Sequence, residues 1–250
     1  MTDPRPSPPR LAAIVTGASR GLGAAIARRV AVDGWAVAVN YRSDAAGADA
    51  VVASIRATGG TAEALHADVT DEDGVSRLIA ATTKRLGPVG AVVANATGPQ
   101  PGLRLDELSW RAHLDQLEYF VKSPTLLVKA ALPSFRARGG GRVVMIGSDM
   151  IDRALPASSA YVAAKSAQLG LVKIWAKELG PDHVTVNVVA PGWIPVERHA
   201  GVDVTAYEAE VPLGRMGVPA DVAAMVAYLI SDAGAFVTGQ TVTVNGGHVL

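Results

Sequence analysis

A glycine-rich stretch near the start of the chain sets its fold: Thr16-Gly17-Ala18-Ser19-Arg20-Gly21-Leu22-Gly23. It joins an apolar run at 11–16 to a helical segment at 22–33. Its three glycines allow a tight turn and a close approach of the backbone to a ligand. The start of a helix offers free N–H groups and a positive dipole end to phosphate. Three glycines alone also fit a plain strand-to-helix turn, but their position after the first apolar run favours a nucleotide-binding loop.

Short apolar runs alternate with longer amphipathic segments along the rest of the chain. Continuous apolar strands separated by helices are typical of a parallel sheet covered on both faces. The expected strands are 11–16, 36–41, 62–67, 89–94, 142–147, 185–189 and 241–244. The expected helices are 22–33, 45–58, 71–86, 106–136, 158–180 and 219–231. No internal repeat or linker divides the chain, so the sequence predicts one α/β domain with seven strands.

Composition narrows the function classes. The 250 residues include 23 basic and 23 acidic side chains, and a formal net charge of zero gives no nucleic-acid or anionic-membrane footprint. The absence of cysteine excludes disulfides and thiolate catalysis, and the five histidines lack metal-ligand spacing, so no metal is expected. The first ten residues lack an apolar core and indicate a disordered tail instead of a signal peptide. We therefore expect a soluble, cytoplasmic protein with no membrane span.

The segment 193–218 mixes Pro, Gly and charged residues and predicts no regular structure. Irregular segments of that length in a folded domain are usually functional or mobile, which predicts a substrate lid here. Four large side chains are candidates for the wall of a substrate pocket, although packing is the alternative for each of them. They are Trp193, Trp175, Tyr119 and Met150.

Ser148, Tyr161 and Lys165 form the candidate catalytic set. Tyr161 and Lys165 are four apart in an Ala-rich helical stretch and so lie on one helix face, whereas Ser148 follows the apolar run at 142–147. Parallel α/β sheets bind ligands at the carboxyl ends of their strands. A phenol has a pKa of about 10, and a neighbouring ammonium is expected to lower that pKa. A Tyr-x-x-x-Lys pair alone is usually a solvated helix face, and the glycine loop makes the catalytic interpretation credible.

The end of the second expected strand, Asn40-Tyr41-Arg42-Ser43, indicates which dinucleotide binds. A cofactor with a free ribose 2′-hydroxyl usually meets an acidic residue about 20 positions after the glycine motif, and none occurs here. Arg20 and Arg42 can pair with a 2′-phosphate through charge-assisted hydrogen bonds. The sequence therefore favours NADP(H) over NAD(H), with two merely solvated arginines as the alternative.

Several ordered motifs resemble those of the short-chain dehydrogenase/reductase family, most of all its 3-oxoacyl-acyl-carrier-protein reductases. The resemblance covers nearly all of the chain after the tail. The matching segments are Thr16–Gly23, Asp68-Val69, Ala94-Asn95-Ala96, the Ser148, Tyr161 and Lys165 set, Pro191-Gly192 and Val244-Asn245-Gly246-Gly247. The resemblance implies a doubly wound, seven-stranded Rossmann fold over residues 11–250, usually assembled as a homotetramer.

The resemblance also assigns roles. Tyr161 would donate a proton to a ketone, Ser148 would hydrogen-bond the carbonyl oxygen, and Lys165 would bind the nicotinamide ribose while lowering the pKa of Tyr161. NADPH would carry the hydride. The candidate cofactor-binding residues are Gly17, Ser19, Arg20, Gly21, Leu22, Gly23, Tyr41, Arg42, Ser43, Asp68, Val69, Asn95, Ala96, Tyr161, Lys165, Pro191, Gly192 and, through its backbone, Ile194.

Departures from the family pattern concern the surroundings of the cofactor and of Lys165. Thr97 stands where a glycine is usual, and Val196 stands where a threonine is usual. The family's catalytic Asn, which holds a relay water behind the Lys, has no clear counterpart. Alignment from Trp110 places Leu117 at that position, and alignment back from Lys122-Ser123-Pro124 places Phe120 there. Gln116 or Glu118 is a candidate substitute in a rerouted relay.

The resemblance implies an acyl carrier protein as a partner, but only one of the two ends of its docking surface matches. Arg136 and Arg138 fit one end of a basic docking surface, whereas Pro181-Asp182 is acidic where a basic residue is expected. This departure disfavours a fatty-acid carrier-protein substrate and favours a specialised ketone. The function predicted from the resemblance is NADPH-dependent reduction of a ketone, either a 3-oxoacyl thioester or a specialised-metabolite ketone. The alternatives are an NAD-linked alcohol dehydrogenase and an NADP-binding scaffold that has lost catalysis.

Overall fold

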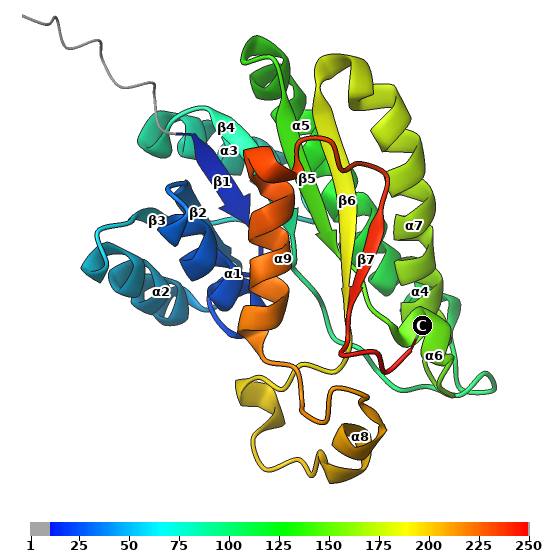
Figure 1. Ribbon diagram of the computed structural model, residues 1–250. Helices are drawn as coiled ribbons and strands as arrows, with labels where there is room; N and C mark the ends of the chain where they lie inside the picture. The colour runs from blue at the N-terminus through cyan, green and yellow to red at the C-terminus, as the bar shows by residue number, and fades with distance from the viewer. Residues whose placement is uncertain (1–10, 250) are drawn as a thin grey trace, which may run out of the picture.

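The computed structural model describes residues 11–249, so the predicted tail at 1–10 lies outside the described residues. All seven predicted strands are present and form one parallel sheet in the order β3-β2-β1-β4-β5-β6-β7 (Figure 1). Their bounds are β1 Ala12–Val15, β2 Ala36–Tyr41, β3 Thr61–His66, β4 Val89–Ala94, β5 Gly141–Ile146, β6 Val184–Pro191 and β7 Thr241–Val244. The order reverses beside β1, between β2 and β4, which is where doubly wound sheets open a ligand crevice.

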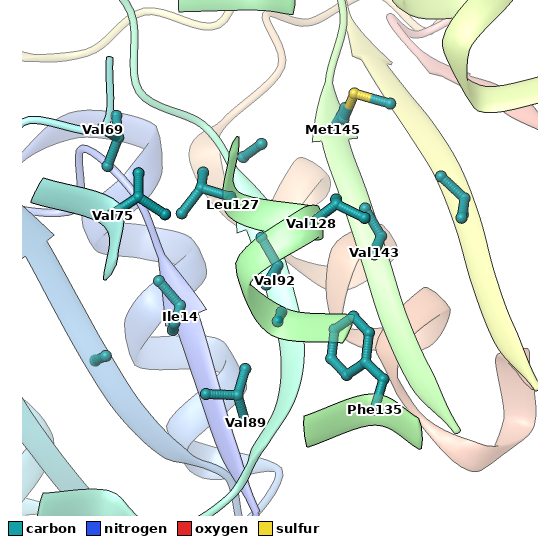
Figure 2. Close-up of a cluster of buried hydrophobic side chains, with 14 of the residues drawn as sticks. Ile14, Val69, Val75, Val89, Val92, Leu127, Val128, Phe135, Val143 and Met145 are labelled. Atoms are coloured by element: carbon teal, nitrogen blue, oxygen red, sulfur yellow. The ribbon is translucent and has the colours of Figure 1, made fainter. Parts of the chain in front are cut away.

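Helices cover both faces of the sheet, as the continuous apolar strands predict. The long helices are α1 Gly21–Val32, α2 Ala45–Ala57, α3 Glu72–Leu86, α5 Ser123–Ala137, α7 Ser159–Leu179 and α9 Pro219–Ile230. Alternate strand residues pack into two separate cores: Ile14 faces one and Val15 faces the other. Figure 2 shows the first core, where Leu127 and Phe135 of α5 lie over Val92 and Val143 of the sheet.

Local sequence signals explain several helix starts. Asp44 accepts a hydrogen bond from the Gly47 N–H at 2.9 Å and caps α2, and Asp71 accepts one from the Gly74 N–H at 2.7 Å and caps α3. Ser109 caps α4, Trp110–Leu117, by accepting from the Ala112 N–H at 3.2 Å. Such caps satisfy N–H groups that have no partner within the helix.

The predicted single helix over 106–136 is wrong in two respects. It begins only at Trp110, and a π-helical turn at Glu118–Lys122 separates α4 from α5. A π turn inserts one residue into the helical repeat and is often found at functional sites. Pro124 gives a local reason for the interruption, because it has no N–H to donate to the carbonyl of Phe120 four residues earlier.

The predicted irregular segment at 193–218 contains two short helices. They are a 3-10 turn at Glu197–His199 and the helix α8, Thr205–Glu210, which lies beyond the end of the sheet that also carries α6, Met150–Arg153 (Figure 1). Within residues 11–249, no helix has the length and apolar character needed to span a membrane. No group of His, Asp or Glu in that range is arranged to hold a metal ion.

Candidate active site

The glycine loop after β1 forms a cradle that side chains would fill. Gly17 and Gly21 have φ angles of +61° and +56°, a conformation that favours glycine. A Cβ atom at Gly23 would lie 2.4 Å from the Gly17 carbonyl oxygen, so helix α1 can approach the loop only without a side chain there. Arg20 at the N-cap makes no side-chain cap, which leaves the first N–H groups of α1 free for an anion.

Asn95, predicted to bind cofactor, braces this loop. Its Nδ2 donates to the carbonyl oxygens of Thr16 at 2.9 Å and of Gly17 at 3.1 Å. The backbone N–H groups of Asn95 and Ala96 donate to the Thr16 hydroxyl at 3.0 and 2.9 Å. The side chain of Asn95 is therefore committed to the shape of the loop.

Arg42 does not stand free as a solvated arginine. Its Nη1 donates to the hydroxyl of Tyr119 and lies 3.7 Å from Oδ2 of Asp68. Burial alone would raise the pKa of Asp68, but hydrogen bonds from the Thr70 hydroxyl and N–H, together with the charge of Arg42, hold that pKa below its ordinary value. Asp68 and Tyr119 thus fix the guanidinium at the edge of the cavity.

Ser148, Tyr161 and Lys165 come together at the carboxyl end of β5, as predicted. Ser148 is buried, and its Oγ accepts the Met150 N–H at 3.2 Å. Burial raises the pKa of the Tyr161 hydroxyl above its usual value, and a hydrogen bond with Ser148 and the charge of Arg198 offset this only in part. The Tyr161 proton is therefore held on the hydroxyl at neutral pH.

The prediction that Lys165 makes Tyr161 more acidic is wrong for this structure. Nζ of Lys165 lies 5.6 Å from the centre of the Tyr161 ring and donates instead to the Ile146 carbonyl oxygen at 2.5 Å. Burial lowers the pKa of Lys165 to about 7, because the charged ammonium loses its water. Among the groups that shift the pKa of Tyr161, Arg198 and Asp149 contribute charge and Lys165 does not.

Phe120 closes the space behind Lys165. It is only 3% exposed, its ring meets the Tyr161 ring edge-on at 5.4 Å, and its centre lies 3.7 Å from Nζ of Lys165. The π turn brings Phe120 to the position that the alignment from Lys122 indicated. Lys165 therefore has an aromatic face and one carbonyl as its neighbours where the family pattern has an amide.

The two candidate relay substitutes bind elsewhere. Gln116 is buried, and its Nε2 donates to the Pro99 carbonyl oxygen at 2.7 Å. Glu118 lies 3.2 Å from Nη2 of Arg111 on the exposed side of the helix. Neither makes a direct hydrogen bond to Lys165, but the buried Oε1 of Gln116 has no hydrogen-bond partner among the described residues, so a relay through Gln116 or Glu118 stays a prediction.

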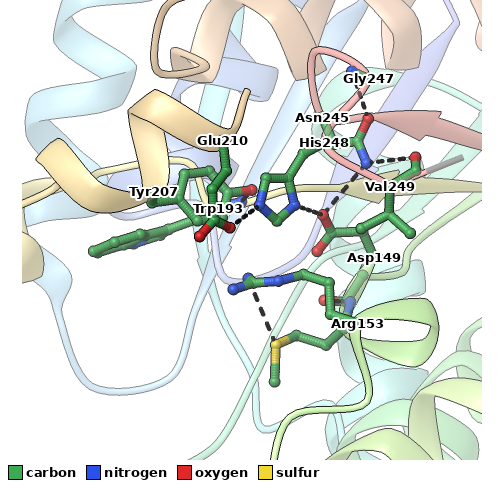
Figure 3. A network of polar contacts seen from close by, with 11 residues as sticks. Asp149, Arg153, Trp193, Tyr207, Glu210, Asn245, Gly247, His248 and Val249 are labelled. Carbon is green, nitrogen blue, oxygen red and sulfur yellow. Dashed lines mark hydrogen bonds and ion pairs between the residues drawn. The ribbon is translucent and has the colours of Figure 1, made fainter. Parts of the chain in front are cut away.

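Asp149, which directly follows Ser148, is a buried polar group of the site. It is 1% exposed and accepts from Asn245 Nδ2 at 3.4 Å (Figure 3). Burial raises the pKa of its carboxyl, although Asn245 and the charges of Arg153 and His248 oppose that rise. Its partners Asn245 and His248 lie near the other end of the chain, so local spacing could not indicate this burial.

Helix α8 is held against this network by the C-terminal segment. The His248 ring stacks on Tyr207 at 4.3 Å, and its Nε2 lies 3.2 Å from Glu210 Oε2 (Figure 3). The Tyr207 hydroxyl accepts the Trp193 N–H at 2.9 Å. These contacts tie the start of the segment 193–218 and its helix α8 to the C-terminal segment.

One cavity of about 1170 Å³ joins these parts. It is lined by every predicted catalytic and cofactor-binding residue, from the glycine loop through Tyr41, Ser43 and Val69 to Pro191, Gly192 and Ile194. Trp193, Tyr119 and Met150 line it as well, whereas Trp175 packs against the hydrophobic core. Phe120 lines the cavity too, and so do Arg153 and Arg198, which the sequence had not singled out.

Known proteins share both the sequence pattern and this architecture. Residues 17–248 match a family model described as enoyl-(acyl carrier protein) reductase. A 3-oxoacyl-[acyl-carrier-protein] reductase of Synechocystis is 38% identical over 241 residues, which are 95% of this chain and 96% of the relative.

Two crystal structures are close in fold. A dehydrogenase/reductase from Sinorhizobium meliloti has a TM-score of 0.89 at 35% identity and covers 98% of this chain and 97% of its own. A blue fluorescent protein from a metagenomic library, in complex with NADPH, has a TM-score of 0.88 at 34% identity and covers 97% and 99%. With its Rossmann fold and its matched motifs, the chain belongs to the short-chain dehydrogenase/reductase family of oxidoreductases.

Proposed function

We propose that the protein is an NADPH-dependent ketoreductase in which Tyr161 is the general acid. The observation that carries the proposal is the meeting of the Tyr161 hydroxyl, Ser148 and Lys165 in the cavity that the glycine loop also lines. The substrate would be a 3-oxoacyl thioester or a specialised-metabolite ketone.

The residues present fit a dinucleotide. The glycine cradle and the free N–H groups of α1 suit its pyrophosphate. Arg20 and Arg42 would hold a 2′-phosphate, Lys165 the ribose, and the Ile194 backbone the carboxamide. A bound reduced nicotinamide supplies hydride to the carbonyl carbon.

The protein's own part is proton delivery and placement. The hydroxyl of Tyr161 donates its proton to the carbonyl oxygen as negative charge develops there, and Ser148 hydrogen-bonds the same oxygen. Burial keeps Tyr161 protonated until that moment, because it raises the pKa of the phenol. Phe120 and the buried Lys165 keep water away from the rear of the ring.

NADPH oxidation with a panel of β-keto thioesters and cyclic ketones tests the proposal, with Tyr161→Phe as the matched control. Loss of about 1,000-fold or more in kcat for the variant, with unchanged NADPH affinity, is expected. Turnover no greater than that of the variant for every substrate would contradict the proposal. Enoyl thioesters belong in the panel, because the matched family model carries that description.

Two other candidates are separated by the same assay. An NAD-linked alcohol dehydrogenase would prefer NADH, and an impaired scaffold would bind NADPH without turnover. The fixed guanidinium of Arg42 favours NADP(H), and the retained catalytic set favours an enzyme.

The proposal also covers how the protein assembles and where it is located in the cell. A homotetramer and a cytoplasmic location follow from the family resemblance and are checked by light scattering and by fractionation. A carrier-protein partner has less support, because Asp182 already binds Arg136 at 2.8 Å between Oδ2 and Nε. Direct binding of an acyl carrier protein, compared with an Arg138→Ala variant, tests it.

A further inference from the structure

The charges at the Tyr161 end of the cavity do not balance. The buried carboxylate of Asp149 accepts a hydrogen bond from Asn245, and the buried amine of Lys165 donates one to the Ile146 carbonyl oxygen. Glu197 lies away from them, beside Gly21 in the glycine loop. The guanidinium groups of Arg153 and Arg198 are the cations of this end that stand in the cavity wall without an acidic partner.

Arg153 is fixed in place without an ion pair. Its guanidinium carbon lies 4.9 Å from the centre of the Tyr207 ring, and Nη1 lies 3.9 Å from the sulfur of Met150 (Figure 3). The charge of Asp149 acts on it from a greater distance than a salt bridge. Among residues 11–249, no carboxylate oxygen approaches the Arg153 guanidinium within 4.0 Å.

Arg198, in the turn at Glu197–His199, is more exposed to solvent than Arg153 and has no ion pair either. Its Nε lies 3.1 Å from Nε2 of His199, whose Nδ1 already accepts the Val196 N–H at 3.2 Å. Burial and the charge of Arg198 lower the pKa of His199, so its ring is neutral and has one acceptor nitrogen for two donors. In the described chain this guanidinium also has no carboxylate oxygen within 4.0 Å, although its charge reaches Tyr161.

We propose that Arg153 and Arg198 bind an anionic group of the substrate, so that the enzyme reduces ketones that carry a carboxylate or a phosphate. This rests on the proposed ketoreductase function and names its substrate class. Two guanidinium groups in one cavity wall offer the forked donors that suit carboxylate and phosphate oxygens. Trp193 and Met150 line the same cavity and provide apolar surface for the body of such a substrate.

Binding is measured first in the NADP⁺-loaded Tyr161→Phe protein, where no turnover interferes. Calorimetry compares 4-oxo-4-phenylbutanoate with its methyl ester, which is the same aryl ketone without the charge. We expect the acid to bind at least about tenfold more tightly, as a charge-assisted hydrogen bond suggests. Arg198→Gln and Arg153→Gln should each remove most of that preference, and Arg198→Lys should retain part of it.

Arg215→Gln is the matched control, since Arg215 belongs to the same segment but pairs with Asp221 and does not line the cavity. Its acid-to-ester preference should equal that of the parent protein. A second pair, the acetoacetyl thioesters of pantetheine 4′-phosphate and of pantetheine, identifies the source of the anion. A preference confined to the first pair indicates a keto acid, and one confined to the second indicates a phosphorylated arm.

The inference is overturned if the charged and the neutral ligand of each pair bind equally well. It is also overturned if the preference for the anion survives in both Gln variants, or if neither anionic ligand binds. Wild-type turnover separates this failure from that of the proposed function. Reduction of neutral ketones without any preference for charged ones supports the ketoreductase function and contradicts the anion site. Binding of the anions that depends on the two arginines, without reduction of any ketone, supports the anion site and contradicts the ketoreductase function.

Discussion

The ammonium nitrogen of Lys165 lies 3.7 Å from the centre of the Phe120 ring. A cation over an aromatic face gains electrostatic stabilisation, yet the same ring removes the water that would stabilise the charge better. The two effects act in opposite directions on the pKa of Lys165, and burial prevails, since that pKa falls to about 7. Substitutions at Phe120 can therefore distinguish the effect of the aromatic face from the effect of burial on the pKa of Lys165.

Phe120→Leu and Phe120→Asn should move the pH profile of kcat/KM in opposite directions. The leucine keeps the site dry but loses the aromatic face, so the pKa of Lys165 falls further. The asparagine admits a polar amide and water, so the pKa rises by roughly one unit or more. Rate measurements between pH 5 and pH 10 check this, and a parallel shift for both variants would refute the assigned balance.

Lys165→Met should change how stability depends on pH. The folded-state pKa of about 7 lies below the unfolded value of 10.5, so the unfolded chain binds more protons between these two values. Wild-type stability should therefore rise with pH from about 7 towards 10.5, and the methionine variant should lose that rise. Urea unfolding of the cofactor-free protein at several pH values measures it. Identical slopes for the two proteins would contradict the burial of a titrating amine.

Glu197→Gln should tighten NADPH binding by about threefold or more. The Glu197 carboxylate approaches Gly21 at the start of α1, where it would repel a pyrophosphate. Asp203→Asn is the control, because its Oδ1 accepts from the Thr205 N–H and the residue does not line the cavity. Fluorescence titration of NADPH at two salt concentrations follows the effect, which should shrink at high salt. An unchanged dissociation constant would show that the side chain moves aside without cost.

Arg42→Ala should weaken NADPH at least about tenfold and NADH less than threefold, since a charge-assisted contact to the 2′-phosphate is lost. Tyr119→Phe offers a finer comparison, because it releases Arg42 from one hydrogen bond while leaving its charge in place. We expect Tyr119→Phe to keep the preference for NADPH. Equal losses for the two cofactors in Arg42→Ala would instead indicate a general defect of the pocket.

His248→Ala should loosen α8 without unfolding the sheet. The variant loses the stacked contact with Tyr207 and the approach to Glu210, at a cost of about 1 kcal/mol. Hydrogen exchange should accelerate in Thr205–Glu210 and stay slow in Val89–Ala94. Equal protection of both segments in the variant and the wild type would show that the C-terminal segment does not hold the helix.

Much of the fold was predictable from the sequence, because its determinants are local. The apolar runs specify strands that are buried on both sides, and the glycine loop specifies a tight turn into α1. Five of the six predicted helices have counterparts whose ends differ by a few residues, and the sixth, 106–136, is interrupted by the π turn. The meeting of Ser148, Tyr161 and Lys165 follows from helical spacing and from strand ends that share one edge of the sheet.

Only the tertiary structure decided the electrostatics of the site. The pKa values of Tyr161, Lys165 and Asp149 depend on burial, and burial is set by elements distant in sequence, such as the π turn and the C-terminal segment. The partners of Arg42 and the unpaired state of Arg153 and Arg198 likewise depend on which loops meet. Spacing along a chain determines which side chains share a face, whereas desolvation and charge pairing depend on everything that packs around them.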